Sequence, residues 1–66
     1  MNKVLIILDK EAQEVHTFNN YDEHYYDNLT DFLEFVNEKY NLELKECNIQ
    51  WMVADKNYFQ ITTRTL

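Results

Sequence analysis

The stretch DNLTDFLEFVNEKYN, residues 27–41, decides the fold because its apolar residues recur with the period of an α-helix. They are spaced i, i+3, i+4, i+7 and i+11 and form one face: Leu29, Phe32, Leu33, Val36 and Tyr40. Asn28 is placed to cap the first turn, with Asp31 three residues later as in a capping box. Asn41 suits a left-handed helix end. The stretch therefore predicts an amphipathic helix that begins at Asp27 or Asn28 and ends at Tyr40.

Before the helix, two short segments have the composition of β-strands. Lys3–Leu8 is rich in aliphatic and β-branched residues, and Glu14–Phe18 follows it after a polar break. We expect the second segment to be the return arm of a hairpin. The first is apolar on both faces, which predicts a central strand or a strand buried at an interface.

After the helix, the hydrophobic period changes to two. From Leu44 onward apolar and polar residues alternate, and one side carries Cys47, Ile49, Trp51 and Val53. Cys47 is accordingly expected to be a small core residue and not a nucleophile. The segment Asp55–Asn57 suits a hairpin turn in which Asn57 takes a positive φ, and Tyr58–Thr65 is expected to return as a fourth strand.

Together these segments predict a single α+β domain over residues 1–66. The expected order is ββαββ, an antiparallel sheet of two hairpins with one amphipathic helix packed on one face, and the strand order is left open. Because one helix covers only one face of the sheet, some apolar residues are left over. That excess indicates a homodimer or an obligate partner, or else tyrosines that simply lie half-exposed. For the homodimer, the expected interface is Leu5, Ile7 and Trp51.

The composition limits the possible classes of protein. The 66 residues include no glycine and no proline, so Asn and Asp are expected to form the turns, and glycine loops that bind phosphate are excluded. Cys47 is the only cysteine, which excludes a disulfide within one chain and indicates a reducing compartment. The apolar run Val4–Leu8 is too short for a membrane span or a signal peptide, so a cytoplasmic location is expected.

Charge is separated along the chain. Asp and Glu total 12 against 6 Lys and Arg, the formal net charge is −6, and no base interrupts the acids between Glu11 and Glu38. Four of these acids recur with helical spacing, in a narrow stripe opposite the apolar face: Asp27, Asp31, Glu34 and Glu38. At about 1.5 Å rise per residue, the stripe spans roughly 16 Å. A basic groove that neutralises DNA phosphates could accept such a row.

The stripe has two interpretations. It can be the solvated face of an amphipathic helix, where the helix dipole stabilises Asp27 and Asp31. That interpretation does not explain Glu38, which lies near the C-terminal end, where negative charge is unfavourable. Phe35, beside the stripe, resembles an interface anchor with a charged rim, although it can also widen the core face. If the stripe is a binding face, the predicted partner-binding residues are Asp22, Glu23, Asp27, Asp31, Glu34, Phe35 and Glu38.

The sequence does not predict an enzyme. A sheet with one helix offers little room for a pocket that would push the pKa values of paired carboxylates apart, and the chain has no serine. His16 and His24 could bind a metal together with Asp22, Glu23 and Asp27, but their spacing matches no known ligand signature. No catalytic residue, cofactor or metal is therefore expected.

In size, charge and composition the chain resembles the small acidic DNA-mimic inhibitors of phages. The resemblance rests on no motif and assigns no residue roles. It implies an inhibitor in the host-cell cytoplasm that imitates the phosphate backbone and occupies the DNA-binding site of a basic protein. Such a partner would be a nucleoid protein such as HU, or a restriction, CRISPR, polymerase or repair factor. The alternative is a small homodimeric structural or accessory subunit whose acidity serves solubility only. Direct binding to nucleic acid or to a membrane is not expected.

Overall fold

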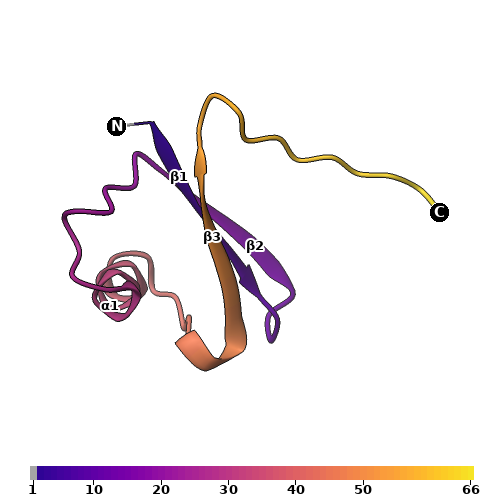
Figure 1. Ribbon diagram of the computed structural model, residues 1–66. Coiled ribbons are helices and arrows are strands. Elements are labelled where there is room, and N and C mark those ends of the chain that lie inside the picture. Colours follow the sequence, from indigo (N-terminus) through magenta and orange to yellow (C-terminus); the bar gives the residue numbers. More distant parts are fainter. Residues whose placement is uncertain (1) are drawn as a thin grey trace.

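The computed structural model describes residues 2–66 and places one helix on one face of a three-stranded antiparallel sheet (Figure 1). The elements follow one another as β1 (Lys3–Asp9), β2 (Glu14–Asn19), α1 (Leu29–Tyr40), the 3-10 turn η1 (Glu46–Asn48) and β3 (Ile49–Asp55). The strand order is β2-β1-β3, so β1 is the central strand. This α+β arrangement confirms the predicted fold class.

Strand β1 is buried on both of its faces. Leu5 and Ile7 face α1 and have no exposed surface. Val4 and Ile6 point to the opposite face, where side chains of the neighbouring strands flank them. Leu5 and Ile7 therefore belong to the core, which corrects their assignment to a dimer interface. The alternation along the strand separates the two faces but does not say which one the helix covers.

Helix α1 begins and ends at the predicted caps. The side-chain oxygen of Asn28 accepts a hydrogen bond from the backbone N–H of Asp31 at 2.9 Å. Asn41 adopts the left-handed conformation, with φ 57° and ψ 49°, and its N–H donates to the carbonyl of Asn37. Tyr40 departs from the prediction, because it is 55% exposed and does not join the apolar face.

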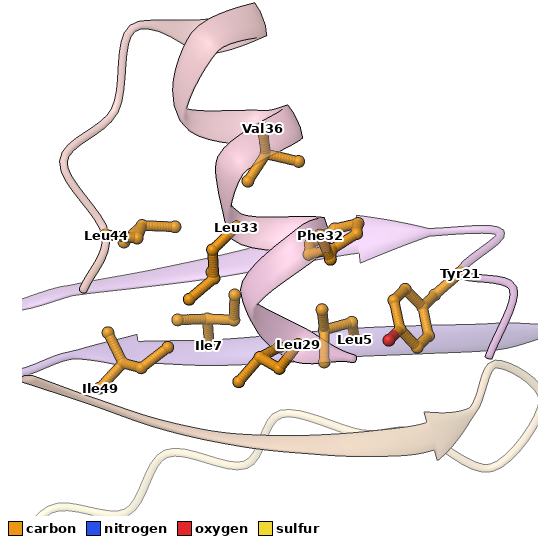
Figure 2. Close-up of a cluster of buried hydrophobic side chains, with 9 residues drawn as sticks. All are labelled: Leu5, Ile7, Tyr21, Leu29, Phe32, Leu33, Val36, Leu44 and Ile49. Atoms are coloured by element: carbon orange, nitrogen blue, oxygen red, sulfur yellow. The ribbon is translucent and has the colours of Figure 1, made fainter. Parts of the chain in front are cut away.

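The core lies between α1 and the sheet, and Figure 2 shows its side chains meeting there. Its buried members are Leu5, Ile7, Tyr21, Leu29, Phe32, Leu33, Val36, Leu44 and Ile49. The ring of Tyr21 meets that of Phe32 edge-on, with centroids 5.1 Å apart. The N–H of Tyr21 donates to the carbonyl of Lys3 at 3.0 Å, which ties the segment after β2 to the start of β1.

The link from α1 to β3 is held by the side chain of Asn37. Its amide group donates to the Leu44 carbonyl at 2.9 Å and accepts from the Leu44 N–H at 3.0 Å. Strand β3 begins at Ile49, after η1, and Cys47 lies exposed in η1. The expectation that Cys47 is a core residue is therefore wrong.

Left-handed residues take the place of glycine in this chain, as expected. Asn20 and Asn41 have positive φ, at 60° and 57°. Gln13, in the turn between β1 and β2, also has a positive φ of 58°, which the sequence did not indicate. Asn57, predicted to take a positive φ, is not among the described residues that do so.

Residues 56–66 do not form the predicted fourth strand. The N–H groups of Tyr58 and Phe59 both donate to the carbonyl of Asp55, at 3.0 and 2.9 Å, and the Asp55 side chain accepts from the N–H of Asn57 at 2.9 Å. These bonds form a helix-like turn where a hairpin turn was expected. The segment then runs away from the sheet without regular secondary structure (Figure 1).

Candidate protein-binding face

The acids of α1 lie on the side of the helix that faces away from the core. Asp31, Glu34 and Glu38 are exposed, whereas the buried residues of the helix are Leu29, Phe32, Leu33 and Val36. Asp27 precedes the cap residue Asn28 and so lies outside the helix, which makes the helical row shorter than predicted. From Asp31 to Glu38 the helix rises by about 10 Å.

Lysine and arginine do not neutralise these carboxylates. Within residues 2–66, no Lys or Arg lies within ion-pair distance of a carboxylate, and the one histidine–carboxylate contact joins His16 and Glu14, with 3.6 Å between Nε2 and Oε1. The carboxylates of α1 are therefore hydrated in the unbound protein, and their charge is not cancelled by a neighbouring ammonium or guanidinium group.

The connector between β2 and α1 carries three more acids, of which Asp22 lines a depression together with Phe35 of α1. The Asp22 side chain accepts from the N–H of His24 at 2.9 Å, and the Asp22 carbonyl accepts from the N–H of Tyr25 at 3.2 Å. This turn holds Asp22 in a half-buried position, while Glu23 and Asp27 are exposed. We call the acids of the connector and α1 the acidic face: Asp22, Glu23, Asp27, Asp31, Glu34 and Glu38.

An aromatic depression lies where the connector meets α1. It has a volume of about 310 Å³, and its lining residues are Asn20, Asp22, Tyr25, Tyr26 and Phe35. Tyr26 organises it, since its ring lies 4.8 Å from that of Tyr25 and 6.2 Å from that of Phe35. Phe35 is 47% exposed, so the predicted anchor does present its ring to solvent.

Tyr25 and Tyr26 were not among the predicted binding residues. Their signal in the sequence was a pair of adjacent aromatic residues in an acidic segment close to the helix start. Their contacts with Phe35 depend on the path of the connector, which hydrophobic periodicity does not specify.

One base borders the acidic face. The ammonium group of Lys39 lies 5.5 Å from the ring centroids of both Phe35 and Tyr40. These are cation–π distances, and they hold Lys39 on the side of the helix that carries Phe35. The separation of charge is therefore less complete in space than along the sequence, although Lys39 forms no ion pair with the acids of α1.

Two tyrosines near the acidic face keep their protons more firmly than usual. Burial raises the pKa of Tyr21, and the nearby charges of Glu23 and Tyr26 raise it further. Burial likewise raises the pKa of Tyr26, with smaller contributions from Tyr25 and Asp22. Both phenols are neutral near pH 7, so the negative charge of this region comes from its carboxylates.

A second group of polar side chains lies at the other end of the domain, on the β1–β2 hairpin. Potential ligand atoms of Asp9, Glu14 and His16 lie within 4.8 Å of one another, and Nε2 of His16 is buried without a hydrogen-bond partner. Among residues 2–66 this is the one such group, and it does not include His24 or the connector acids. His16 and His24 thus do not form the joint metal site considered from the sequence.

Comparison with protein-family models, with curated proteins and with solved structures gives no match for this chain. In the part of the chain that the structure describes, no helix has both the length and the apolar character needed to cross a membrane.

Proposed function

We propose that this protein binds a basic nucleic-acid-binding protein through its acidic face and so blocks the partner's DNA-binding site. In this proposal the carboxylates imitate the phosphate backbone, and the protein acts by binding and not by catalysis. The basic partner belongs to the class of nucleoid proteins such as HU, or of restriction, CRISPR, polymerase or repair factors.

The observation that carries the proposal is the unpaired state of the helix carboxylates. Asp31, Glu34 and Glu38 are exposed, and no base within residues 2–66 lies at ion-pair distance from them. Glu34 and Glu38 are four residues apart, a like-charge arrangement that mildly destabilises a helix. A cationic partner would relieve this repulsion, since its bases would replace the missing counter-charges.

The spacing of the carboxylates is compatible with a site built for phosphates. Along the axis, Asp31 and Glu34 are separated by about 4.5 Å and Glu34 and Glu38 by about 6 Å. Phosphates of one DNA strand advance by about 3.4 Å each along the duplex axis. The two rows differ in detail but are similar in scale, so long lysine and arginine side chains can reach either.

The aromatic depression supplies what a row of charges lacks. Charged residues at the rim of an interface mainly speed association, whereas buried aromatic anchors provide much of the affinity. Phe35 and Tyr25 are exposed beside the acids and already lie against Tyr26. We therefore expect the partner to cover these two rings and contact the carboxylates around them.

The test is capture of host proteins on the immobilised chain at low and at high salt, followed by their identification. The proposal predicts a DNA-binding protein that is retained at low salt, released at high salt, and displaced by duplex DNA. Captured proteins that do not bind DNA, or that DNA does not displace, would contradict it.

A second candidate function, a homodimeric structural or accessory subunit, is favoured by a different observation. The sheet face away from α1 is uncovered, and Leu8, Val15 and Met52 are exposed there. In that case charge reversal on the acidic face would leave assembly unchanged, whereas polar substitutions on the uncovered side of the sheet would abolish it.

A further inference from the structure

The C-terminal segment has the sequence of a strand but has no strand partner. In Gln60–Leu66 most residues are β-branched, and in an extended chain Ile61, Thr63 and Thr65 would lie on one side and Gln60, Thr62 and Arg64 on the other. The whole segment is exposed, including 74% of Ile61. An isolated extended segment of this kind gains nothing from its β-propensity unless it pairs with a sheet edge.

Strand β3 offers such an edge. It pairs with β1 on one side only, because it is the last strand in the order β2-β1-β3. An open apolar groove of about 600 Å³ runs along it, lined by Ile6, Leu8, Ile49, Gln50, Trp51 and Met52. Trp51 and Met52 are about half exposed, at 49% and 53%. Long uncovered edges of this kind are usually protected in natural proteins.

We propose that Gln60–Leu66 of one chain pairs with the β3 edge of a second copy, so that two chains exchange their C-terminal segments in a homodimer. Gln60–Leu66 is long enough to pair along β3, which has 7 residues. Ile61 enters the groove beside Met52, while Gln60 and Arg64 remain in solvent. This arrangement adds a fourth strand to each sheet and covers the β3 edge of each of the two copies.

The turn at Asp55 favours a second copy over the chain's own β3. Hydrogen bonds from the N–H groups of Tyr58 and Phe59 to the Asp55 carbonyl turn the backbone away from the β3 edge. The N–H of Lys56 also donates to the carbonyl of Asn2, at 2.6 Å, which fixes the start of the segment against β1. Gln60 and Thr62 still line a shallow depression with Met52 and Ala54 of the same chain, and the segment then projects away from its own sheet (Figure 1).

Charge also favours pairing with another copy. All of the acids precede Lys56, so the segment after Asp55 carries two bases, Lys56 and Arg64, and no acid. The rest of the chain is strongly acidic, because it contains all 12 acids and only the bases Lys3, Lys10, Lys39 and Lys45. Two folded domains of this charge repel each other, and Arg64 of an exchanged segment would bring a positive charge close to the acidic second copy and so reduce that repulsion.

The first test compares the mass of the full chain in solution with the masses of two variants, one changed at Ile61 and one at Gln60. The full chain is expected at twice 8.1 kDa by sedimentation or light scattering. Ile61→Asp should shift it to a monomer because a carboxylate cannot enter the apolar groove. Gln60→Asp is the matched control, since it adds the same charge on the solvent side, and it should remain a dimer. A chain that ends at Phe59 should be a folded monomer, checked by circular dichroism.

The second test shows which chain receives the segment. One chain carries the substitutions Cys47→Ser and Thr63→Cys, a spin label on the new cysteine, and no ¹⁵N. It is mixed with a second chain that is enriched in ¹⁵N and carries no spin label. If the segments are exchanged, the spin label of one chain lies beside β3 of the other, so the NMR signals of the β3 amides in the ¹⁵N chain should broaden.

Three results would overturn the proposal. One is a monomeric full chain, and another is a dimer that survives both Ile61→Asp and the truncation. The third is a mixed sample in which the β3 amides stay sharp, which would mean that the segment pairs with its own β3 or with nothing.

Discussion

The two sides of helix α1 differ in how their residues obtain partners. On the inner side, Phe32, Leu33 and Val36 are buried against the sheet and are satisfied within the chain. On the outer side, Glu34 and Glu38 have no counter-charge within residues 2–66. Apolar periodicity thus accounts for the stability of the helix, while Glu34 and Glu38 add nothing to it. The charge on the outer side therefore has to be balanced by solvent or by a partner.

The largest effect is expected for Phe32→Ala on the inner side. Phe32 is 4% exposed and meets the rings of Phe18, Tyr21 and Tyr26 edge-on, with centroids 5.0 to 5.2 Å away. Its truncation should lower the free energy of unfolding by about 3–5 kcal/mol. Urea denaturation followed by the fluorescence of Trp51 would measure it.

Phe35→Ala is the matched control on the outer side, because its ring is already half in water. It should cost about 1 kcal/mol or less. Equal losses for the two variants would mean that the two sides of α1 do not differ as described. If Phe32→Ala does not fold, Val36→Ala gives a smaller loss that can be compared in the same way.

Asn37 lies at the border between the two sides, and its side chain makes both of its hydrogen bonds to the backbone of Leu44. Asn37→Ala leaves a part-buried N–H and carbonyl without their partner. It should cost about 2 kcal/mol, because unsatisfied buried polar groups lose their hydration without a replacement. Asn57→Ala, in an exposed turn, serves as the control. A loss as small as that of the control would show that water replaces the side chain of Asn37.

The pKa of Tyr21 predicts how the inner side responds to alkali. Because burial raises its pKa in the folded protein, the unfolded chain loses the phenol proton first, near pH 10. The folded state then binds more protons than the unfolded state, so stability is full below pH 10 and falls as the pH rises through the folded pKa.

Tyr21→Phe should remove part of this fall, and Tyr26, whose pKa is also raised, should account for a further part. Unfolding curves between neutral and alkaline pH would show it. An unchanged pH profile in Tyr21→Phe would contradict the assignment.

The smallest effect is expected for Glu38→Gln on the outer side. It removes a like charge four residues from Glu34 and a negative charge near the C-terminal end of α1. Both changes favour the helix, so stability should rise by about 0.3–0.8 kcal/mol, while partner binding should weaken. Thermal melting and binding are measured on the same sample. A loss of stability would mean that Glu38 has a favourable contact within the chain.

The helix could be predicted from the sequence because its signals are local. The spacing of Leu29, Phe32 and Val36 and the caps at Asn28 and Asn41 specify its bounds without reference to the rest of the chain. The three strands were also recognisable from composition and alternation. Their order was predicted only in part: the apolar faces of β1 indicated a central strand or one buried at an interface, but the sequence did not say which strands lie beside it.

The rest depends on contacts that are distant in sequence or on details of the backbone. Alternation could not place Leu5 and Ile7 under the helix in preference to Val4 and Ile6. β-propensity in Tyr58–Thr65 did not reveal that hydrogen bonds to Asp55 turn the segment away. In the candidate site, the acids of α1 were predicted, but the contact of Phe35 with the connector was not, because it depends on tertiary packing.

The most direct test of the acidic face is competition with fluorescent duplex DNA for the DNA-binding protein captured as described above. The wild-type chain is compared with Asp31→Lys/Glu34→Lys/Glu38→Lys and with a control, Glu11→Lys/Glu14→Lys/Glu43→Lys, which changes the net charge equally at other exposed sites. We expect wild type and control to displace the DNA at similar concentrations. The reversal on α1 should require about 100-fold more protein, because the three introduced lysines would place like charges against the bases of the partner. Equal displacement by the two triple variants, with both folded by circular dichroism, would contradict a role for the α1 carboxylates in binding.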